Sequence, residues 1–537
     1  MKHKYIGAVL FICILHAHAF SQPVLGTQKT FGGSNYDELR KLCLTKDGGY
    51  IAGGFSYSNV SGEKSQNSRG FNDYWIIKAN RNGKILWEKT IGGDGNDNFK
   101  SVIQTNDGGY ALIGESSSNI SGEKTDYCRG NTDYWLVKLD STGNIQWDKT
   151  YGGLGTELID NIVQAADGSY ILAGSSDSYA YGEKTEDTRG NFDMWVVKVD
   201  VNGNKLWDKT IGGSDYDLCS PVQLTKDGGV ILGGFSGSNI SGEKSENNRG
   251  YSSDYWVVKL NKNGQIQWDK TIGGAQDDYC RGLIQTSDGG YLLGGNSNSN
   301  ASAEKTANSW GGYDFWVVKI DKKGNKVWDK TIGGLYDESE LWEVDSTLDG
   351  KGYIFGGGST SPISGNKTEY SRGGNDYWVI KINKKGKVLW NKAFGGSNDE
   401  YLRSIVEIEQ NKFLLGGVSS SDISGEKTEN SRGSGDYWIV QLNDRTGISS
   451  VIASSQNADA ATSASTGFKV YPNPAGNILH ISINNEATVS LTDERGKIML
   501  TKKVNKNDII NVAALLPGIY YLKNNATNES QKIAVVK

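Results

Sequence analysis

One unit of about 60 residues recurs along most of the chain and constrains its fold more than any other feature. The register is set by the tripeptide Asp-Tyr-Trp or a close variant, whose tryptophans are Trp75, Trp135, Trp195, Trp256, Trp316, Trp378 and Trp438. Successive tryptophans are 60, 60, 61, 60, 62 and 60 residues apart. A fixed period of this length is typical of proteins that repeat one supersecondary unit. The sequence therefore predicts seven copies of a single unit.

Each copy contains four short runs of strand-forming residues. In the second copy these runs are residues 101–105, 110–114, 134–139 and 145–151. The pair Asp107-Gly108 separates the first two runs and is a strong hairpin signal, and a long polar loop at 116–132 precedes the third. No run has the spacing of an amphipathic helix. Each copy is therefore expected to form a four-stranded antiparallel sheet.

The two ends of the repeat region complement each other. A lone strand of the fourth type lies at 26–33, before the first copy, and the last copy stops after its third strand at 437–442. The N-terminal strand can therefore complete the last sheet, whereas an open solenoid would need polar caps. Four-stranded units that pack face to face around an axis form β-propellers. We predict an all-β chain in which residues 22–446 form a seven-bladed β-propeller closed by the N-terminal strand.

The first residues have the pattern of a secretory signal peptide. Two lysines precede a short apolar run at 6–15, and small residues follow it. This run is too short to span a bilayer, and no later stretch is apolar enough to do so. We predict a signal peptide at 1–21 that directs Sec-dependent export, with cleavage after Ser21 or, alternatively, after Ala19. No transmembrane segment is expected.

The composition changes after the repeats. Residues 447–467 are rich in Ser, Ala, Thr and Asn without periodicity and are expected to form a flexible linker. Residues 468–537 then alternate as in a small antiparallel β-sandwich. They contain Phe-Lys-Val-Tyr-Pro-Asn-Pro from residue 468, Thr-Asp-Glu-Arg-Gly-Lys from 492 and Leu-Pro-Gly-Ile-Tyr-Tyr-Leu from 516. In this order, the segments resemble the type A C-terminal sorting domain of the type IX secretion system.

The resemblance carries expectations about export. The matching motif residues are Tyr471, Pro472, Asn473, Pro474, Pro517, Gly518 and Tyr520. It implies a bacterium of the Bacteroidetes group, recognition of this domain by the type IX secretion machinery, and passage through the outer membrane. It also implies that the domain is then removed and the protein is released or attached to the surface. The repeats look like propeller repeats of secreted proteins from that group, which names no ligand.

Charge and histidine content exclude several classes of function. The 57 basic and 62 acidic residues give a net charge of −5, which argues against a nucleic-acid partner. The four histidines are His3, His16, His18 and His480, so the repeats contain none. This excludes His-dependent catalysis and His-ligated metals from the repeats. The protein is more consistent with a non-enzyme, no organic cofactor is expected, and Ca²⁺ is the one metal left open.

Four cysteines follow the signal peptide, and they do not recur once per copy. They are Cys43, Cys128, Cys219 and Cys280, which excludes a disulfide framework. Cys219 and Cys280 occupy the same position in adjacent copies. Either a bridge between them or two buried free thiols fits this spacing.

An acidic residue follows the second glycine of each Gly-Gly pair by four positions. The seven members are Asp37, Asp97, Glu157, Asp217, Asp278, Glu338 and Glu400. On one face of a propeller they would form a ring able to bind Ca²⁺, a cationic ligand or a basic peptide. Alternatively, each carboxylate accepts hydrogen bonds from its own loop. Their presence in every copy favours the structural role.

The long loop carries a lysine in all seven copies and an arginine in six of them. The arginines are Arg69, Arg129, Arg189, Arg249, Arg372 and Arg432, and the lysines are Lys64, Lys124, Lys184, Lys244, Lys305, Lys367 and Lys427. They could present a charged face to a polyanionic glycan or a protein. The favoured interpretation is that each arginine pairs with a loop carboxylate and holds the loop against its blade.

Two tryptophans break the register of the repeat. Trp310 lies in the fifth long loop and Trp342 at the start of the sixth first strand, and Asn366 replaces the loop glutamate of the sixth copy. Both tryptophans are expected on one face, in adjacent blades, where exposed indoles can stack on sugar rings. Drift with local repacking is the alternative.

These observations predict a secreted or cell-surface β-propeller that binds a glycan, matrix or protein ligand. A carboxylate-dependent polysaccharide-degrading enzyme is one alternative, although no acid pair stands out from the repeat. A structural surface-layer protein is another.

Overall fold

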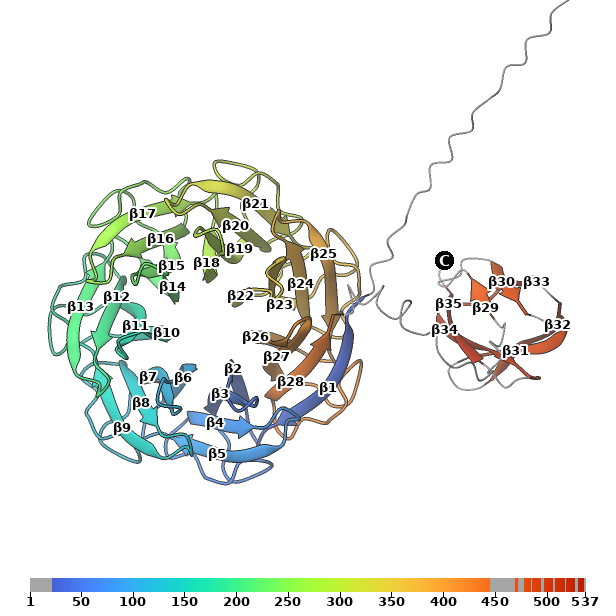
Figure 1. The fold of residues 1–537 in the computed structure, drawn as a ribbon, viewed down its shortest axis with the longest axis horizontal. Coiled ribbons are helices and arrows are strands. Elements are labelled where there is room, and N and C mark those ends of the chain that lie inside the picture. Colours follow the sequence, from blue (N-terminus) through green and yellow to red (C-terminus); the bar gives the residue numbers. More distant parts are fainter. Residues whose placement is uncertain are drawn as a thin grey trace, which may run out of the picture. The chain divides into compact units, whose positions relative to one another are not determined.

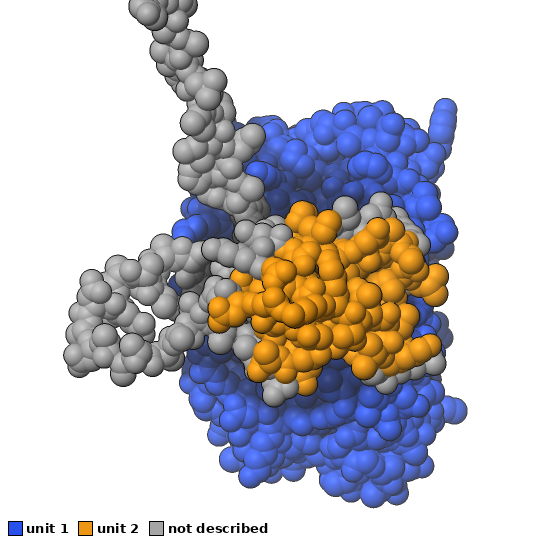
Figure 2. Space-filling view, turned by 90° about the vertical axis from the view of Figure 1, so that its right-hand side faces the viewer, with its two compact units in different colours: residues 1–448 blue, residues 449–537 orange. Residues whose placement is uncertain are grey.

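The computed structural model describes residues 22–444 and 469–535, except 472–477, 484, 494–496, 506–507, 517 and 527–529. The chain divides into two compact units, Met1–Ile448 and Ser449–Lys537 (Figure 2). Every helix or strand element among the described residues is a β-strand. The predicted signal peptide at 1–21 and linker at 447–467 lie outside the described residues.

Consecutive strands of the first unit form four-stranded antiparallel sheets, each in the order of the chain. The first sheet contains β2 (Asp37–Leu44), β3 (Tyr50–Ser56), β4 (Asp73–Ala79) and β5 (Ile85–Ile91). The second contains β6 (Asp97–Gln104), β7 (Tyr110–Ser116), β8 (Asp133–Leu139) and β9 (Ile145–Tyr151). The third contains β10 (Glu157–Gln164), β11 (Tyr170–Ser176), β12 (Asp193–Val199) and β13 (Lys205–Ile211).

The same order continues through the next three sheets. The fourth contains β14 (Asp217–Leu224), β15 (Val230–Ser236), β16 (Asp254–Leu260) and β17 (Ile266–Ile272). The fifth contains β18 (Asp278–Gln285), β19 (Tyr291–Ser297), β20 (Asp314–Ile320) and β21 (Lys326–Ile332). The sixth contains β22 (Glu343–Ser346), β23 (Gly352–Ser359), β24 (Asp376–Asn383) and β25 (Val388–Phe394). The first strand of each sheet lies nearest the common axis (Figure 1).

The last sheet of this unit joins strands from both ends of the repeat region. It contains β26 (Glu400–Glu409), β27 (Lys412–Ser419), β28 (Asp436–Asn443) and β1 (Val24–Phe31). Strand β1 pairs antiparallel with β28, with Phe31 opposite Tyr437 and Val24 opposite Asn443. The lone N-terminal strand therefore takes the outer position that β5 and β9 take in their own sheets (Figure 1).

The core of this unit lies between neighbouring sheets. One cluster joins Ile76 of β4 and Phe99 of β6 to Trp135 of β8, and all three side chains are buried. The repeated tripeptide builds this contact directly, because the Tyr74 hydroxyl donates a hydrogen bond of 3.1 Å to the carbonyl oxygen of Trp135 in the next sheet. Each tryptophan of the repeat is therefore a structural residue that packs neighbouring sheets together.

The strands nearest the axis differ from the predicted bounds. In the second copy β6 begins at Asp97, four residues before the predicted start at 101. In the sixth copy β22 has only four residues, whereas the corresponding strands of the other sheets have eight or ten. The sixth copy is thus irregular in backbone as well as in sequence.

The second unit consists of two antiparallel sheets with one shared core. One sheet has the order β29-β30-β33 and the other β32-β31-β34-β35. Their bounds are β29 (Lys469–Tyr471), β30 (Ile478–Ser482), β31 (Ala487–Asp493), β32 (Ile498–Val504), β33 (Asp508–Asn511), β34 (Gly518–Asn524) and β35 (Ser530–Val535). Leu479 of β30 and Leu522 of β34 are both buried in this core. Two packed antiparallel sheets are the arrangement expected for residues 468–537.

The predicted sorting motif is described in part. Tyr471 ends β29 and pairs with His480 of β30 through the backbone, and Gly518 begins β34. The buried Tyr520 donates a hydrogen bond of 2.9 Å to the carbonyl oxygen of Leu516. Pro472, Asn473, Pro474 and Pro517 lie outside the described residues.

Candidate ligand-binding sites

The seven repeated acids are buried where the innermost strands begin. Asp97 shows the pattern: one carboxylate oxygen accepts hydrogen bonds from the Gly93 amide, at 2.6 Å, and from the Ser118 hydroxyl, at 2.9 Å. Asp37, Glu157, Asp217, Asp278, Glu338 and Glu400 accept the equivalent bond from a glycine amide. All seven are at most 2% exposed. This geometry fits the structural role, because carboxylates buried in their own loops do not face a ligand.

A second carboxylate lies close to each of these acids. Asp73, the aspartate of the tripeptide, accepts a hydrogen bond from the Arg69 amide at 2.7 Å. Burial raises the pKa of Asp73 to about 6, and the charge of Asp97 adds to the rise. Among the described residues, no group of three or more His, Cys, Asp or Glu side chains is suited to hold a metal ion.

The loop lysines point into the protein. Lys124 is buried, and its ammonium donates to the Thr150 hydroxyl and lies 5.7 Å from the ring centre of Trp135. Lys64, Lys184, Lys244 and Lys427 lie over the corresponding tryptophans in the same way. These lysines therefore anchor the long loops to the core and do not form a charged surface.

The loop arginines connect neighbouring sheets. Each pairs with the glutamate of the next long loop, as in Arg129–Glu183 at 3.0 Å and Arg189–Glu243 at 2.7 Å. The other pairs are Arg69–Glu123, Arg249–Glu304, Arg372–Glu426 and Arg432–Glu63. The arginines thus pair with loop carboxylates as expected. The glutamate belongs to the following copy, and Arg129 and Arg249 also pair with an acid of their own loop, Asp126 and Glu246.

The junction between the fifth and sixth sheets lacks this ion pair. Trp310 stands at the position of the arginine, and Asn366 stands at the position of the glutamate. The Trp310 side chain is 56% exposed, and its indole lies against the next loop, where a Cβ on Gly365 would be 3.1 Å from it. Leu335 and Tyr336 follow the Gly-Gly pair beside it and are also exposed. We call Trp310, Leu335 and Tyr336 the rim patch.

The backbone around Trp310 brings these three residues together. A Cβ on Gly311 would lie 2.4 Å from the carbonyl oxygen of Leu335 and 2.9 Å from that of Tyr336. The Trp310 amide donates to the carboxylate of Asp314 at 2.6 Å, which is the bond that Arg129 makes to Asp133 in its own copy. The loop therefore keeps its regular backbone and replaces only the side chains of the ion pair with an exposed apolar surface.

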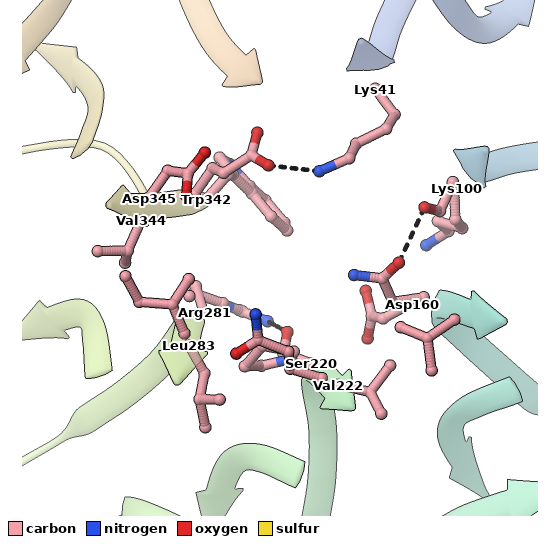
Figure 3. A pocket seen from close by; sticks show the side chains of 18 of the residues that line it. Lys41, Lys100, Asp160, Ser220, Val222, Arg281, Leu283, Trp342, Val344 and Asp345 are labelled. Carbon is pink, nitrogen blue, oxygen red and sulfur yellow. Dashed lines mark hydrogen bonds and ion pairs between the residues drawn. The ribbon is translucent and has the colours of Figure 1, made fainter. Parts of the chain in front are cut away.

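Trp342 lies at a different feature, a central cavity of about 360 Å³ between the innermost strands (Figure 3). It immediately precedes the short strand β22 and is half-buried. The guanidinium carbons of Arg281 and Arg403 lie 5.3 and 5.0 Å from its ring centre. Trp310 does not line this cavity. The two tryptophans, expected together on one face, therefore do not share one cavity.

The central cavity is strongly charged, which the sequence analysis missed. Its cations are Arg40, Lys41, Lys100, Arg281 and Arg403, and its acids are Asp160, Glu343 and Asp345. Burial raises the pKa of Asp160 to about 6, although the charges of Lys100 and Arg281 lower it in part. One signal was available: the third residue after the repeated acid is Arg or Lys in four copies.

The two aligned cysteines form no bridge. Cys219 and Cys280 are both buried and both free. Burial raises the pKa of the Cys280 thiol to about 12. They are therefore small packing residues, the second of the two alternatives.

The C-terminal unit can now be assigned by comparison. Residues 469–537 match the family described as secretion system C-terminal sorting domain. These residues are a sorting domain. The chain is therefore exported by type IX secretion, to the cell surface or the surroundings of the cell. Within the described residues, the structure contains no helix with the length and apolarity to cross a membrane.

The chain is also similar to several other proteins. A regulatory protein of Caulobacter vibrioides, FlaEY, is 24% identical over 400 residues, which cover 68% of this chain and 40% of the relative. The chain thus spans less than half the length of that protein. The WD40 domain of Neurospora crassa Pan2 is 9% identical with a TM-score of 0.41, and the match covers 78% of this chain and 95% of the Pan2 chain. BamB from Moraxella catarrhalis is 12% identical with a TM-score of 0.35, and the match covers 78% of this chain and 99% of BamB.

Proposed function

We propose that this protein is a secreted or surface-attached binding protein that recognises a glycan through the rim patch. The observation that carries the proposal is the replacement of a repeated ion pair by an exposed tryptophan. Both partners of the pair change together, as Trp310 and Asn366, while the loop backbone keeps its regular hydrogen bond to Asp314. An indole face beside exposed Leu335 and Tyr336 suits the apolar faces of sugar rings.

The proposal includes the architecture that presents this patch. We infer that the repeat sheets are seven blades of a closed propeller and that β1 closes the ring. Contacts between the last sheet and the first support closure: the Tyr437 hydroxyl donates to the carbonyl oxygen of Trp75 at 2.9 Å, and Arg432 pairs with Glu63 at 2.7 Å. The same contacts join consecutive sheets elsewhere, as between Tyr74 and Trp135.

The proposal also includes the division of the chain. A signal peptide at 1–21 would start export, residues 22–446 would form the binding domain, and a linker at 447–467 would precede the sorting domain. In this arrangement the sorting domain serves export, and the propeller carries the ligand site.

A glycan-binding panel tests the proposal directly. The purified protein is compared with Trp310→Ala on neutral and acidic polysaccharides, with and without Ca²⁺. Loss of at least tenfold in affinity is expected for Trp310→Ala, because the stacking surface is removed. Tyr251→Ala is the matched control, since Tyr251 is a fully exposed ring in the preceding long loop. Unchanged binding by Trp310→Ala, or no binding to any glycan, would reject the rim patch as a glycan site.

A further inference from the structure

The central cavity has the features of a second binding site. Its walls come from the innermost strands of all the repeat sheets, and their side chains converge on one space (Figure 3). A volume of about 360 Å³ lies within the range of small-ligand pockets, ~300–1,000 Å³. The lining residues of the different copies are not alike, so the cavity wall does not repeat as the blades do.

One side of the cavity presents fixed guanidinium groups. Arg281 and Arg403 come from strands that flank the sixth copy, and both lie over the Trp342 ring. Stacking on an indole holds a guanidinium in place without using its N–H donors. Arg281 also lies 5.2 Å from the ring centre of Phe235 and pairs with Glu340 at 3.0 Å. Its position is therefore set before any ligand arrives.

The terminal nitrogens of Arg281 keep donors for an anionic group. Nη1 donates to the Ser220 hydroxyl at 3.4 Å and Nη2 donates to Glu340 at 3.0 Å. Each terminal nitrogen carries two N–H groups, so each keeps a second donor for an oxyanion of a ligand. Lys41 comes from a different strand of the cavity wall, and its ammonium is already paired with Glu343.

Another part of the cavity wall carries small polar groups. Asp160 and Asn161 lie on β10. Ser220 of β14 lies beside Arg281, which donates to its hydroxyl at 3.4 Å. The side-chain Oδ1 of Asn161 accepts hydrogen bonds from the Ser101 hydroxyl and the Ile162 amide, both at 2.9 Å, while its Nδ2 donates to none of the described residues. Carboxylate, amide and hydroxyl groups of this kind bind hydroxyl groups of a ligand.

We propose that the central cavity binds a uronic acid, with its carboxylate on Arg281 and its hydroxyl groups on Asp160 and Asn161. The fixed guanidiniums select for a carboxylate, and the polar groups of β10 select for a polyhydroxylated ring. The site is distinct from the rim patch, and the inference rests on the proposed function only for the saccharide class of the ligand. A free sugar acid and the end of an acidic polysaccharide share this chemistry.

Isothermal titration calorimetry of the purified protein tests the inference. The probes are glucuronate and galacturonate, their neutral counterparts glucose and galactose, and a galacturonate oligomer that represents the chain end. Saturable uronate binding at least tenfold tighter than that of the neutral sugars is expected. Binding of the oligomer alone would identify the chain end as the source. Equal affinity for acidic and neutral sugars, or no saturable binding of any acidic probe, would overturn the inference.

Variants separate this site from the rim patch. Arg281→Gln is expected to lower uronate affinity at least tenfold, and Arg281→Lys to lower it less, because the charge remains while the planar group is lost. Arg189→Gln is the matched control, since Arg189 also pairs with a glutamate of a neighbouring copy but lies outside the cavity. The melting temperature of each variant shows that it is folded.

Two further outcomes keep the proposals distinguishable. Trp310→Ala is expected to leave uronate affinity unchanged. If Trp310→Ala abolishes uronate binding and Arg281→Gln does not, the cavity site is rejected and the rim patch stands. If Arg281→Gln fails to fold, Trp342→Phe replaces it: the smaller ring weakens the stack on Arg281, so unchanged uronate affinity in that variant would contradict the inference.

Discussion

The junction between the fifth and sixth sheets differs from six other junctions in the ion pair between its long loops. Elsewhere an arginine of one long loop pairs with a glutamate of the next, as Arg129 pairs with Glu183. Here Trp310 and Asn366 replace both partners, while the buried tryptophans on either side, Trp316 and Trp378, keep their places. A partly exposed ion pair contributes only ~0–1 kcal/mol. The comparison teaches that the long loops can exchange their side chains for a new surface at little cost to the fold.

The largest expected effect on stability comes from replacing a core tryptophan, and replacing the tryptophan of the rim patch should have little effect. Trp135→Ala should lower the free energy of unfolding by about 3–5 kcal/mol, because it leaves a cavity between two sheets. Trp310→Ala should change it by less than about 0.5 kcal/mol, because that side chain is largely exposed. Denaturant unfolding measures both values. A large loss from Trp310→Ala would mean that the rim patch is structural.

The next largest effect on stability is expected from the repeated buried acids, which are present in every copy. Asp97→Ala removes the acceptor for the Gly93 amide and the Ser118 hydroxyl, so a loss of about 1–3 kcal/mol in the free energy of unfolding is expected. Asp94→Ala, in the same loop, is the control, because Asp94 is exposed. Equal losses in the two variants would show that burial does not set the role of the repeated acid.

The free energy of unfolding should also depend on pH, through the buried acids at the junctions between sheets. Burial raises the pKa of Asp254 to about 7 and that of Glu157 to about 7, above the usual values for unfolded carboxyls. Between the usual pKa of an unfolded carboxyl and the raised pKa of these two groups, the folded protein binds more protons than the unfolded chain. The stability that the two groups contribute is therefore present at low pH and is lost as pH rises. Thermal melts should show a free energy of unfolding lower by about 1 kcal/mol or more at pH 8 than at pH 5.

A substitution identifies the groups responsible for that pH dependence. Asp254→Asn cannot ionise and should flatten the decrease between pH 5 and pH 8. Asp140→Asn is the control, because hydrogen bonds lower the pKa of Asp140 to about 2, so it stays ionised from pH 5 to pH 8. An unchanged slope in Asp254→Asn would assign the pH dependence to other groups.

The smallest expected effect comes from making the irregular junction regular. The double substitution Trp310→Arg and Asn366→Glu should create the missing ion pair and raise the free energy of unfolding by ~0–1 kcal/mol. The same protein should lose glycan binding at the rim patch. Retained binding would contradict the proposed function, while the stability change by itself tests whether the two positions face each other.

The sequence predicted the sheets well because their signal is repeated. Asp-Gly turns, strand-forming runs and a fixed period specify local structure, and the pairing of β1 with β28 follows from the missing strand of the last copy. The partner of each loop arginine was harder to predict, since Arg129 and Glu183 lie 54 residues apart and the spacing does not say which loop is nearest.

The central cavity could not be predicted in the same way. Arg40, Asp160 and Ser220 stand at one position of the repeat, but they differ in chemical type, so the sequence alone does not show that they line one cavity. Trp342 was noticed only because it breaks the register. Its place in the cavity depends on the short strand β22, which begins at the next residue, and nothing in the sequence specifies where that strand begins.

The inward-facing lysines have a consequence for survival outside the cell. Exposed loops are usually the first places where proteases cut a chain. Trypsin-like enzymes must draw a lysine or arginine side chain into a specificity pocket before they cleave. In the second long loop Lys124 is buried beside Trp135 and Arg129 is held by Glu183, so neither side chain is available without local unfolding. The contacts that anchor this loop thus also protect its cleavage sites from extracellular proteases.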